Sequence, residues 1–233
     1  MEDEIIRKIS KHSALAIESL DCYEPGSEQY NHLRSHDFGL PSSQVFHEAF
    51  MPDTNLRLPK YDLITMFHVH YYWTTQDLRR EITQKVFQHL NPGGVVFILM
   101  LEEGQNHQVA LRKAAKNRFN FVKERDYQSV TLYGSRVGNQ ELNPVAEEMN
   151  LKAYAPHQYN ITIELDMSDL TPNSKTSQLL SYIISVNFDT FPPKMKDFVK
   201  EWVREHGLPV TKDTYQLTQS VTSLMYSKDL NLS

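Results

Sequence analysis

The chain has 233 residues, of which 40% are hydrophobic, so it can bury a substantial core and fits one large globular domain better than two small ones. Its 29 acidic and 24 basic residues give a formal net charge of −5 with no long block of either sign, which argues against nucleic acid and membrane as partners. The single cysteine, Cys22, excludes an internal disulfide and a cysteine-based zinc cluster.

The start of the sequence does not read as an export signal. It begins MEDEIIRKIS, which is acidic and amphipathic, whereas a secretory signal has a basic start followed by an apolar run. The longest apolar stretch, Val95 to Leu101, is too short to span a bilayer. We therefore expect a soluble, cytoplasmic protein. A monomer is a separate expectation.

The first predicted elements lie in LAIESLDCYEPGSEQYNHL, residues 15–33. A strand is expected to end near Tyr23 and Glu24, the Pro-Gly pair then turns the chain, and Ser27 is placed to cap a helix that runs through Leu33. A short strand over 45–50 is expected next, before a loop rich in turn residues.

The central stretch predicts a strand, a helix and a second strand. Residues 61–67, YDLITMF, are expected to form a buried strand, and residues 95–101, VVFILML, are apolar at consecutive positions, as in a strand covered on both faces. The helix between them is expected to be capped by Thr74 with Asp77 and to stop at NPGG, residues 91–94. So short a crossover favours two parallel strands in an α/β sheet.

The second half of the chain predicts more helices and two strands. The helices are expected over 107–118, 143–149, 174–186 and 193–206. The strands are expected over 159–167 and 215–226, and a slip of the apolar alternation near Thr222 and Ser223 predicts a bulge in the last one.

Polar side chains at strand ends are the first candidates for a binding site, because parallel sheets bind ligands outside the carboxyl ends of their strands. Glu24 is expected at such an end, where a carboxylate can accept hydrogen bonds from both hydroxyls of a ribose. Gln29, on the following helix, could reach an adjacent polar group. The alternative is that Glu24 is a solvated residue in a turn.

His68 and His70 raise the question of a metal site. They would share one face if the strand continued as far as His70, and paired imidazoles suit zinc. The residues that follow, Tyr71, Tyr72 and Trp73, supply none of the further ligands that a metallohydrolase needs. We therefore expect no metal, and two alternatives remain: a purely structural histidine pair, or His68 in the lining of a pocket for an organic ligand.

Several motifs, in the same order along the chain, resemble the class I S-adenosylmethionine-dependent methyltransferases, and more narrowly their histamine N-methyltransferase family. They are YEPGSEQY, YDLITMFHVHYY, HLNPGGVVFIL, NRFNF, LDMSD and LLSYIISVNFDTFPP. The resemblance implies a Rossmann-like α/β sheet with helices on both faces, in one domain spanning 1–233. Residues 1–105 would be the remnant of the cofactor-binding half, and 106–233 would carry the substrate-side elements.

The resemblance also implies a cofactor, a substrate and residues for both. The cofactor is S-adenosyl-L-methionine, and the residues implied at its site are Glu24 for the ribose diol, Gln29 and Phe67. The substrate is a small amine or imidazole compound, and the residues implied around it are His68, Tyr71, Tyr72 and Gln219. Tyrosine rings beside a sulfonium and an amine also fit the attraction of cations to ring faces. Gln108 and Arg112 stand near the place of the family's substrate-flanking tryptophans.

One feature of the family has no counterpart before the strand that ends at Glu24. This is the Gly-x-Gly-x-Gly loop, where glycine lets the backbone approach the cofactor. EIIRKISKHS, residues 4–13, is expected to be the helix that follows the loop, so that the first strand, the loop and an amino-terminal substrate lid are missing and two strands lose a neighbour. An inactive, methyltransferase-like binding module is therefore the alternative function.

Overall fold

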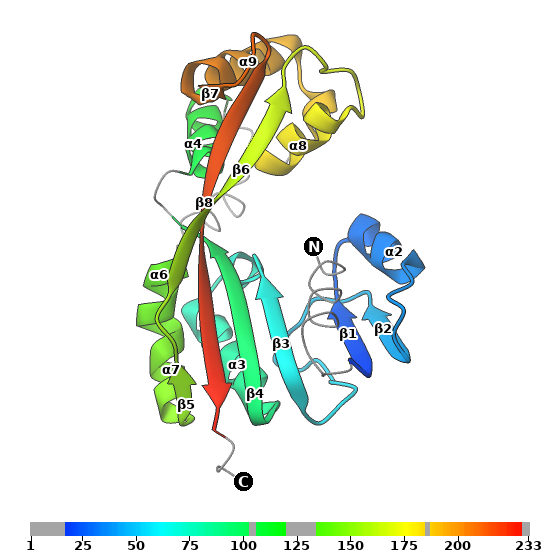
Figure 1. The fold of residues 1–233 in the computed structure, drawn as a ribbon, viewed down its shortest axis with the longest axis vertical. Helices are drawn as coiled ribbons and strands as arrows, with labels where there is room; N and C mark the ends of the chain where they lie inside the picture. The colour runs from blue at the N-terminus through cyan, green and yellow to red at the C-terminus, as the bar shows by residue number, and fades with distance from the viewer. Residues whose placement is uncertain (1–16, 103–105, 120–133, 185–186, 230–233) are drawn as a thin grey trace. The chain divides into compact units, whose positions relative to one another are not determined.

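The computed structural model describes residues 17–102, 106–119, 134–184 and 187–229. The chain divides into two compact units, Met1–Pro59 and Lys60–Ser233, and each contains its own β-sheet (Figure 1). The helix expected over 4–13 lies outside the described residues.

The first unit is built on a two-stranded parallel sheet. Strand β1 (Ser19–Tyr23) pairs with β2 (Ser42–Phe46), and helix α2 (Ser27–Ser35) lies between them in the chain. The predicted strand, turn and helix are confirmed, but the predicted cap is wrong. Gly26 is the N-cap of α2, and the Ser27 hydroxyl instead lies 3.3 Å from Nε2 of His47.

The second unit contains a six-stranded sheet. Strands β3 (Tyr61–Phe67) and β4 (Leu90–Leu101) are parallel, as predicted, with helix α3 (Gln76–Gln88) as their crossover. The long strand β8 (Thr214–Lys228) runs antiparallel to β4, on the side of β4 away from β3, and pairs with three further strands (Figure 1). These strands are β5 (Leu151–Ala153), β6 (His157–Asp166) and β7 (Leu208–Pro209), all antiparallel to β8.

Strand β3 is less buried than its sequence predicts. Among its side chains only that of Met66 is buried, and Leu63 is 42% exposed. In the described part of the chain β3 is the last strand of its sheet, whereas β4 has a neighbour on each side and is buried without a break from Leu99 to Leu101. A consecutive apolar run therefore indicated the right element but not its position in the sheet.

Particular residues determine where helix α3 begins and how the chain passes from α3 into β4. The N-cap of α3 is Thr75, whose side chain accepts a hydrogen bond from the Leu78 N–H at 3.2 Å, so the expected cap at Thr74 is wrong by one residue. The Pro-Gly-Gly segment lies inside β4. A Cβ on Gly94 would stand 2.9 Å from the Asn91 carbonyl oxygen and 3.0 Å from that of Tyr61, so glycine allows this close approach.

The bulge predicted in the last strand is wrong. The pairing of β8 with β4 and with β6 continues without a shift through Thr222 and Ser223. The alternation slips because Val221 and Thr222 are both buried, on opposite faces of the strand. Helix α6 (Gly134–Val137) covers Thr222, since a Cβ on Gly134 would lie 2.8 Å from the Thr222 Cβ.

The remaining helices confirm the predicted pattern. They are α4 (His107–Phe119), α7 (Asn143–Glu148), α8 (Lys175–Ile184) and α9 (Pro193–His206), with a π-helical turn η2 (Gly138–Leu142) before α7 and a 3₁₀ turn η3 (Phe188–Thr190) before α9. In the described residues no helix combines the length and hydrophobicity needed to cross a membrane.

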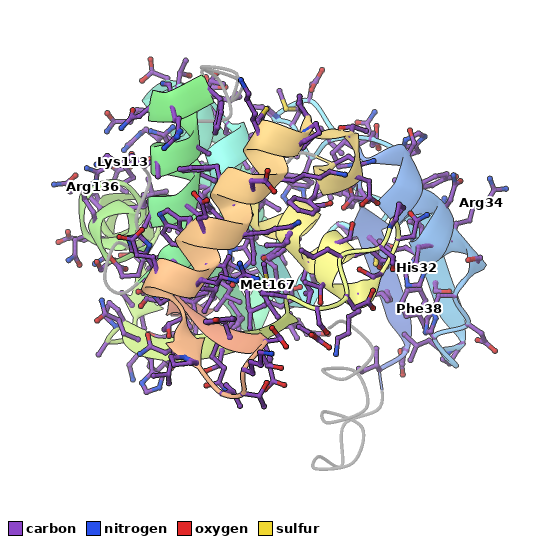
Figure 2. The ribbon with its side chains drawn as sticks, turned by 90° about the horizontal axis from the view of Figure 1, so that it is seen from above. His32, Arg34, Phe38, Lys113, Arg136 and Met167 are labelled. Carbon is purple, nitrogen blue, oxygen red and sulfur yellow. The ribbon has the colours of Figure 1, made fainter. Side chains whose placement is uncertain are left out.

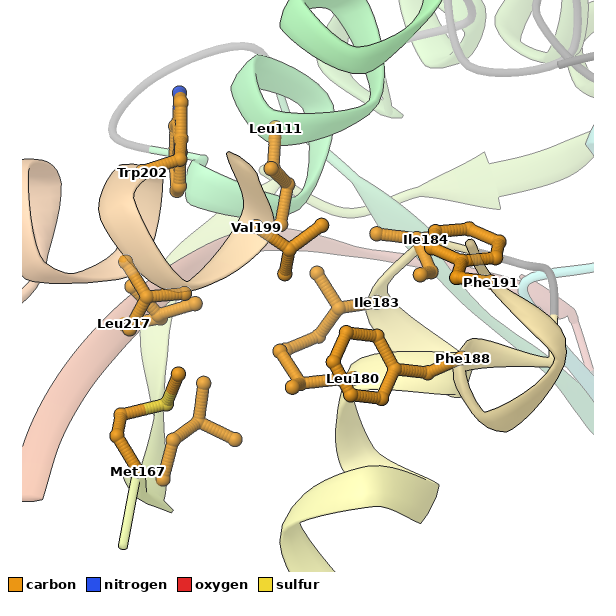
Figure 3. Packing of buried hydrophobic residues seen from close by; sticks show 12 residues of the cluster. Leu111, Met167, Leu180, Ile183, Ile184, Phe188, Phe191, Val199, Trp202 and Leu217 are labelled. Atoms are coloured by element: carbon orange, nitrogen blue, oxygen red, sulfur yellow. The ribbon is translucent and has the colours of Figure 1, made fainter. Parts of the chain in front are cut away.

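Helices α4, α8 and α9 enclose a hydrophobic core against β6 and β8 (Figure 3). Leu180 and Ile183 of α8 meet Val199 of α9 in this core, and all three are at most 1% exposed. Each helix contributes only one apolar stripe, so the helices depend on one another to remove those stripes from water.

Truncation of Leu180 tests this core. We expect Leu180→Ala to lower the free energy of unfolding by about 2–5 kcal/mol, because the side chain is fully buried and leaves a cavity. Leu208→Ala is the matched control. Leu208 is 65% exposed, so its truncation should cost less than about 0.5 kcal/mol. Urea denaturation followed by circular dichroism measures both, and equal losses would contradict the assignment of the core.

Candidate functional site

The chain leaves strand β3 through a strained corner. The strand ends at Phe67, and His68 has a left-handed backbone with φ of 54° while its N–H donates to the Leu99 carbonyl at 2.8 Å. His70 follows in a 3₁₀ turn, η1 (His70–Tyr72). The strand does not continue as far as His70, so His68 and His70 do not share one strand face: a left-handed residue redirects the chain before His70 is reached.

Phe67 forms an apolar wall at the carboxyl end of β3. Its ring meets that of Phe97 edge-on, with 6.1 Å between centroids. Both rings pack against a buried cluster of Leu99, Leu101 and Val221. One side of the corner is therefore apolar. An apolar surface suits the role that the family resemblance implies for Phe67, which is to contact an organic ligand.

The imidazole of His68 is half-buried at this corner. Burial disfavours its charged form and lowers its pKa from 6.5 to about 4. At neutral pH the ring is therefore uncharged, with one nitrogen able to donate a hydrogen bond and the other able to accept one.

His70 lies in the core beneath the corner and is fully buried. Burial, and to a lesser extent the charge of Arg79, lowers its pKa to about 3. Within the described residues neither of its ring nitrogens has a hydrogen-bond partner, and the ring meets Trp73 edge-on at 4.9 Å. This environment favours a structural role for His70.

Arg79 ties the corner to the rest of the unit, a role that the sequence did not indicate. Its guanidinium makes a bidentate pair with Glu141 of η2, with N–O distances of 2.6 and 2.9 Å, and donates to the Trp73 carbonyl at 2.8 Å. The arginine is buried, and its charge is balanced by the carboxylate. The helical period of α3 predicted its apolar face, but not this long-range partner.

Gln219 lies just beyond the carboxyl end of β4. Leu101 pairs with Val221 in the sheet, and the Glu102 N–H donates to the Ser220 carbonyl at 2.9 Å, which places Gln219 one step further along β8. Gln219 is 3% exposed, and its side-chain amide donates a hydrogen bond to the side-chain oxygen of Gln108 on α4, a residue that is 4% exposed. The register thus brings His68 and Gln219 to the same end of β4.

The two other polar residues of this region are engaged in the fold. Arg112 donates to the carbonyls of Ile183 at 2.7 Å and Tyr182 at 3.2 Å, at the carboxyl end of α8. The Glu102 carboxylate accepts hydrogen bonds from the backbone and hydroxyl of Ser135 and from Thr222. Sequence reasoning gave Glu102 no role, and its partners lie far from it in the chain.

Glu24 follows β1 directly, as predicted, in the first unit. Its backbone N–H donates to the Phe46 carbonyl at 3.0 Å, and its carboxylate accepts a hydrogen bond from the Gly26 N–H at 2.7 Å. The side chain is half-buried and oriented by this bond rather than extended into solvent. That a cleft is shared by Glu24 and the corner at His68 stays a prediction.

The remaining predicted residues lie on two short helices. Gln29 is in α2 and Tyr71 in η1, and their side chains are outside the described atoms. Tyr72 is 72% exposed. Across the described ranges, no three or more His, Cys, Asp or Glu side chains are grouped so that they could hold a metal ion.

No protein-family profile matches the sequence. No curated protein sequence matches it either.

Solved structures do match this chain. YcgJ from Bacillus subtilis is 11% identical, with a TM-score of 0.57 over 97% of this chain and 98% of YcgJ. A proposed methyltransferase from Bacillus halodurans C-125 is 10% identical, with a TM-score of 0.52 over 96% of this chain and 98% of its own. The chain therefore has the Rossmann-like α/β fold of these proteins, which confirms the predicted fold class, and identities this low establish the fold alone.

The buried histidine predicts a pH dependence of stability. The unfolded chain protonates His70 below a pKa of about 6.5, whereas the folded chain resists protonation until about 3, so acidification favours the unfolded state. This one residue should remove about 2 kcal/mol of stability between about pH 7 and pH 5. We expect His70→Leu to abolish that contribution and to leave stability at neutral pH unchanged or higher, because no hydrogen bond is lost in the described structure.

The measurement is urea unfolding at several pH values. His157→Leu is the control, since His157 is exposed on β6 and its replacement should keep the pH slope of the wild type. A His70→Leu protein with the slope of the wild type would contradict the assignment.

Proposed function

We propose that the chain binds S-adenosyl-L-methionine and transfers its methyl group to a nitrogen of a small amine or imidazole compound, as in the histamine N-methyltransferase family that it resembles. The fold supports this proposal, because such sheets bind ligands at the carboxyl ends of parallel strands. The observation that carries it is the corner at His68, where a left-handed backbone and a desolvated imidazole coincide at such a strand end. Both features cost free energy, and strain of this kind gathers at functional sites.

Glu24 and Phe67 are the residues proposed for the cofactor. The hydrogen bond from Gly26 occupies Oε1 of Glu24 and orients the carboxylate, which leaves Oε2 to accept hydroxyl groups of a ribose. Phe67 and Phe97 supply the apolar surface. Gln29 is proposed at the same end of the cofactor.

The neutral state of His68 suits methyl transfer to nitrogen. When bound, the cofactor supplies a methyl carbon that accepts the lone pair of the substrate nitrogen, while the C–S bond breaks and its electrons remain on sulfur. The nitrogen must be uncharged to attack, and an uncharged imidazole can accept a hydrogen bond from its N–H. A neutral ring also does not repel a sulfonium, so His68 would orient the substrate, and alignment would supply most of the rate.

The buried amide pair supports a polar substrate. The bond between Gln219 and Gln108 uses one donor and one acceptor, and leaves the carbonyl oxygen of Gln219 and the amide nitrogen of Gln108 for other partners. An acceptor beside a donor complements the N–H and bare nitrogen of a neutral imidazole. Tyr71 and Tyr72 on η1 are proposed beside them, where a tyrosine ring can face a cation.

Calorimetric titration with S-adenosylhomocysteine tests the cofactor site. We expect binding by the wild type and a loss of affinity of about tenfold or more in Glu24→Ala, because the ribose hydroxyls lose a charged acceptor. Glu48→Ala is the matched control, since Glu48 is an exposed glutamate of the same unit, and its replacement should leave the affinity unchanged. No binding by the wild type at millimolar ligand would reject the proposed enzyme and favour the binding module.

Substitution of the amide pair tests the substrate site. With a panel of small amines and imidazoles, we expect Gln219→Leu to raise the KM of the accepted substrate about tenfold, while the affinity for S-adenosylhomocysteine stays unchanged. Gln158→Leu, on the exposed side of β6, should leave both constants unchanged. An equal loss of cofactor affinity in Gln219→Leu would show that the residue acts on the fold rather than on the substrate.

A further inference from the structure

We propose that His32 and His36 of the first unit form a two-imidazole chelate for a divalent transition-metal ion, independent of methyl transfer. The sequence places them four residues apart, at the carboxyl end of α2. His32 lies in the last turn of α2, and His36 is its C-cap, with an extended backbone of φ −85° and ψ 130°, so the two imidazoles meet at the end of the helix.

The ring geometry fits a shared ion. The centroids of the two imidazoles are 6.3 Å apart and their planes are inclined by 33°. Two imidazoles in adjacent positions on one ion, each bound through nitrogen at about 2.0–2.1 Å, have centroids roughly 4.5–5 Å apart. Closing the chelate therefore brings the rings about 1–2 Å nearer, and His32 is exposed, so its side chain can rotate to do so.

The segment after α2 restrains His36. Its backbone N–H donates to the Leu33 carbonyl at 3.2 Å, and its ring meets that of Phe38 edge-on, with 4.9 Å between centroids. Asp37 accepts a hydrogen bond from the Gly39 N–H at 2.8 Å, which closes the turn after His36. The second ligand is thus partly positioned before an ion arrives.

The nearest cation on the helix is directed elsewhere. Arg34 lies 5.9 Å from the ring centroid of Tyr30 and donates to its hydroxyl at 3.3 Å. Figure 2 shows Arg34 projecting outward from α2. The guanidinium therefore does not occupy the space between the two histidines.

The chemistry of imidazole identifies the class of ion. Each ring has two nitrogens, so one can bind the ion while the other keeps a hydrogen bond. Imidazole suits Cu²⁺, Ni²⁺ and Zn²⁺, and a site of two ligands completed by water should follow the general order of affinity, with Cu²⁺ bound most tightly.

Titration of the full-length, tag-free protein with Cu²⁺ tests the site, by calorimetry and by electron paramagnetic resonance. We expect one tight site with two nitrogen ligands, and a loss of affinity of about tenfold or more in each of His32→Gln and His36→Gln. His47→Gln is the matched control. His47 lies in the same unit, but stacks on Tyr30 at 4.3 Å, and its replacement should change the affinity less than about twofold. Wild-type affinity in either of the first two variants overturns the proposal.

A second measurement needs no variant. Diethylpyrocarbonate modifies accessible imidazoles, and bound Ni²⁺ should protect His32 and His36 of the wild type while leaving His47 and His157 reactive. Peptide mass spectrometry reads each residue separately. Unchanged modification of His32 and His36 at saturating Ni²⁺ also overturns the proposal, whether or not the protein binds S-adenosylhomocysteine.

Discussion

The parallel pairing of β3 with β4 is the constraint on which the second unit depends. After a register shift that follows Tyr61, the ladder runs regularly from Leu63 opposite Val95 to Phe67 opposite Leu99, and the His68 N–H adds its last bond. Because His68 is left-handed, β3 cannot continue, and the corner is fixed beside the end of β4. The antiparallel pairing of β8 with the same strand brings Gln219 to that end. One strand therefore positions two candidate residues that are far apart in the sequence.

Burial and local pairing determine which side chains are charged around the corner at His68. Desolvation keeps His68 and His70 neutral, the charge of Arg79 is balanced by Glu141, and the Glu102 carboxylate accepts three hydrogen bonds from its neighbours. A region with neutral histidines and a paired arginine offers dipoles and aromatic faces beside one hydrogen-bonded carboxylate. Such surroundings suit the methyl transfer proposed above, in which a cationic donor meets a neutral nucleophile and catalysis depends on alignment.

The periodicity of the sequence predicted the helices and strands. Contacts between residues far apart in the chain determine the geometry of the candidate site. The strand over 61–67 and the helix over 193–206 were predicted with their observed bounds, because each shows a strong local pattern. The left-handed backbone of His68, the cover of α6 over Thr222 and the bond between Gln108 and Gln219 have no local signature. Glu24 was placed correctly because Pro25 and Gly26 mark the turn after its strand. A cleft shared by Glu24 and His68 stays a prediction, because no local pattern encodes how two units of a chain are arranged.

The exposed edge of β3 raises the question of what holds His68 in a strained conformation. In the described part of the chain, β4 is the only strand that pairs with β3, and Leu63 is 42% exposed. A strained residue persists only where its surroundings over-determine it. Here the support comes from beneath: the buried rings of His70 and Trp73 fill the corner, and Arg79 fastens the Trp73 carbonyl to Glu141 of η2. The rigidity of the candidate site therefore derives from the packing of α3 and η2 rather than from a second strand neighbour.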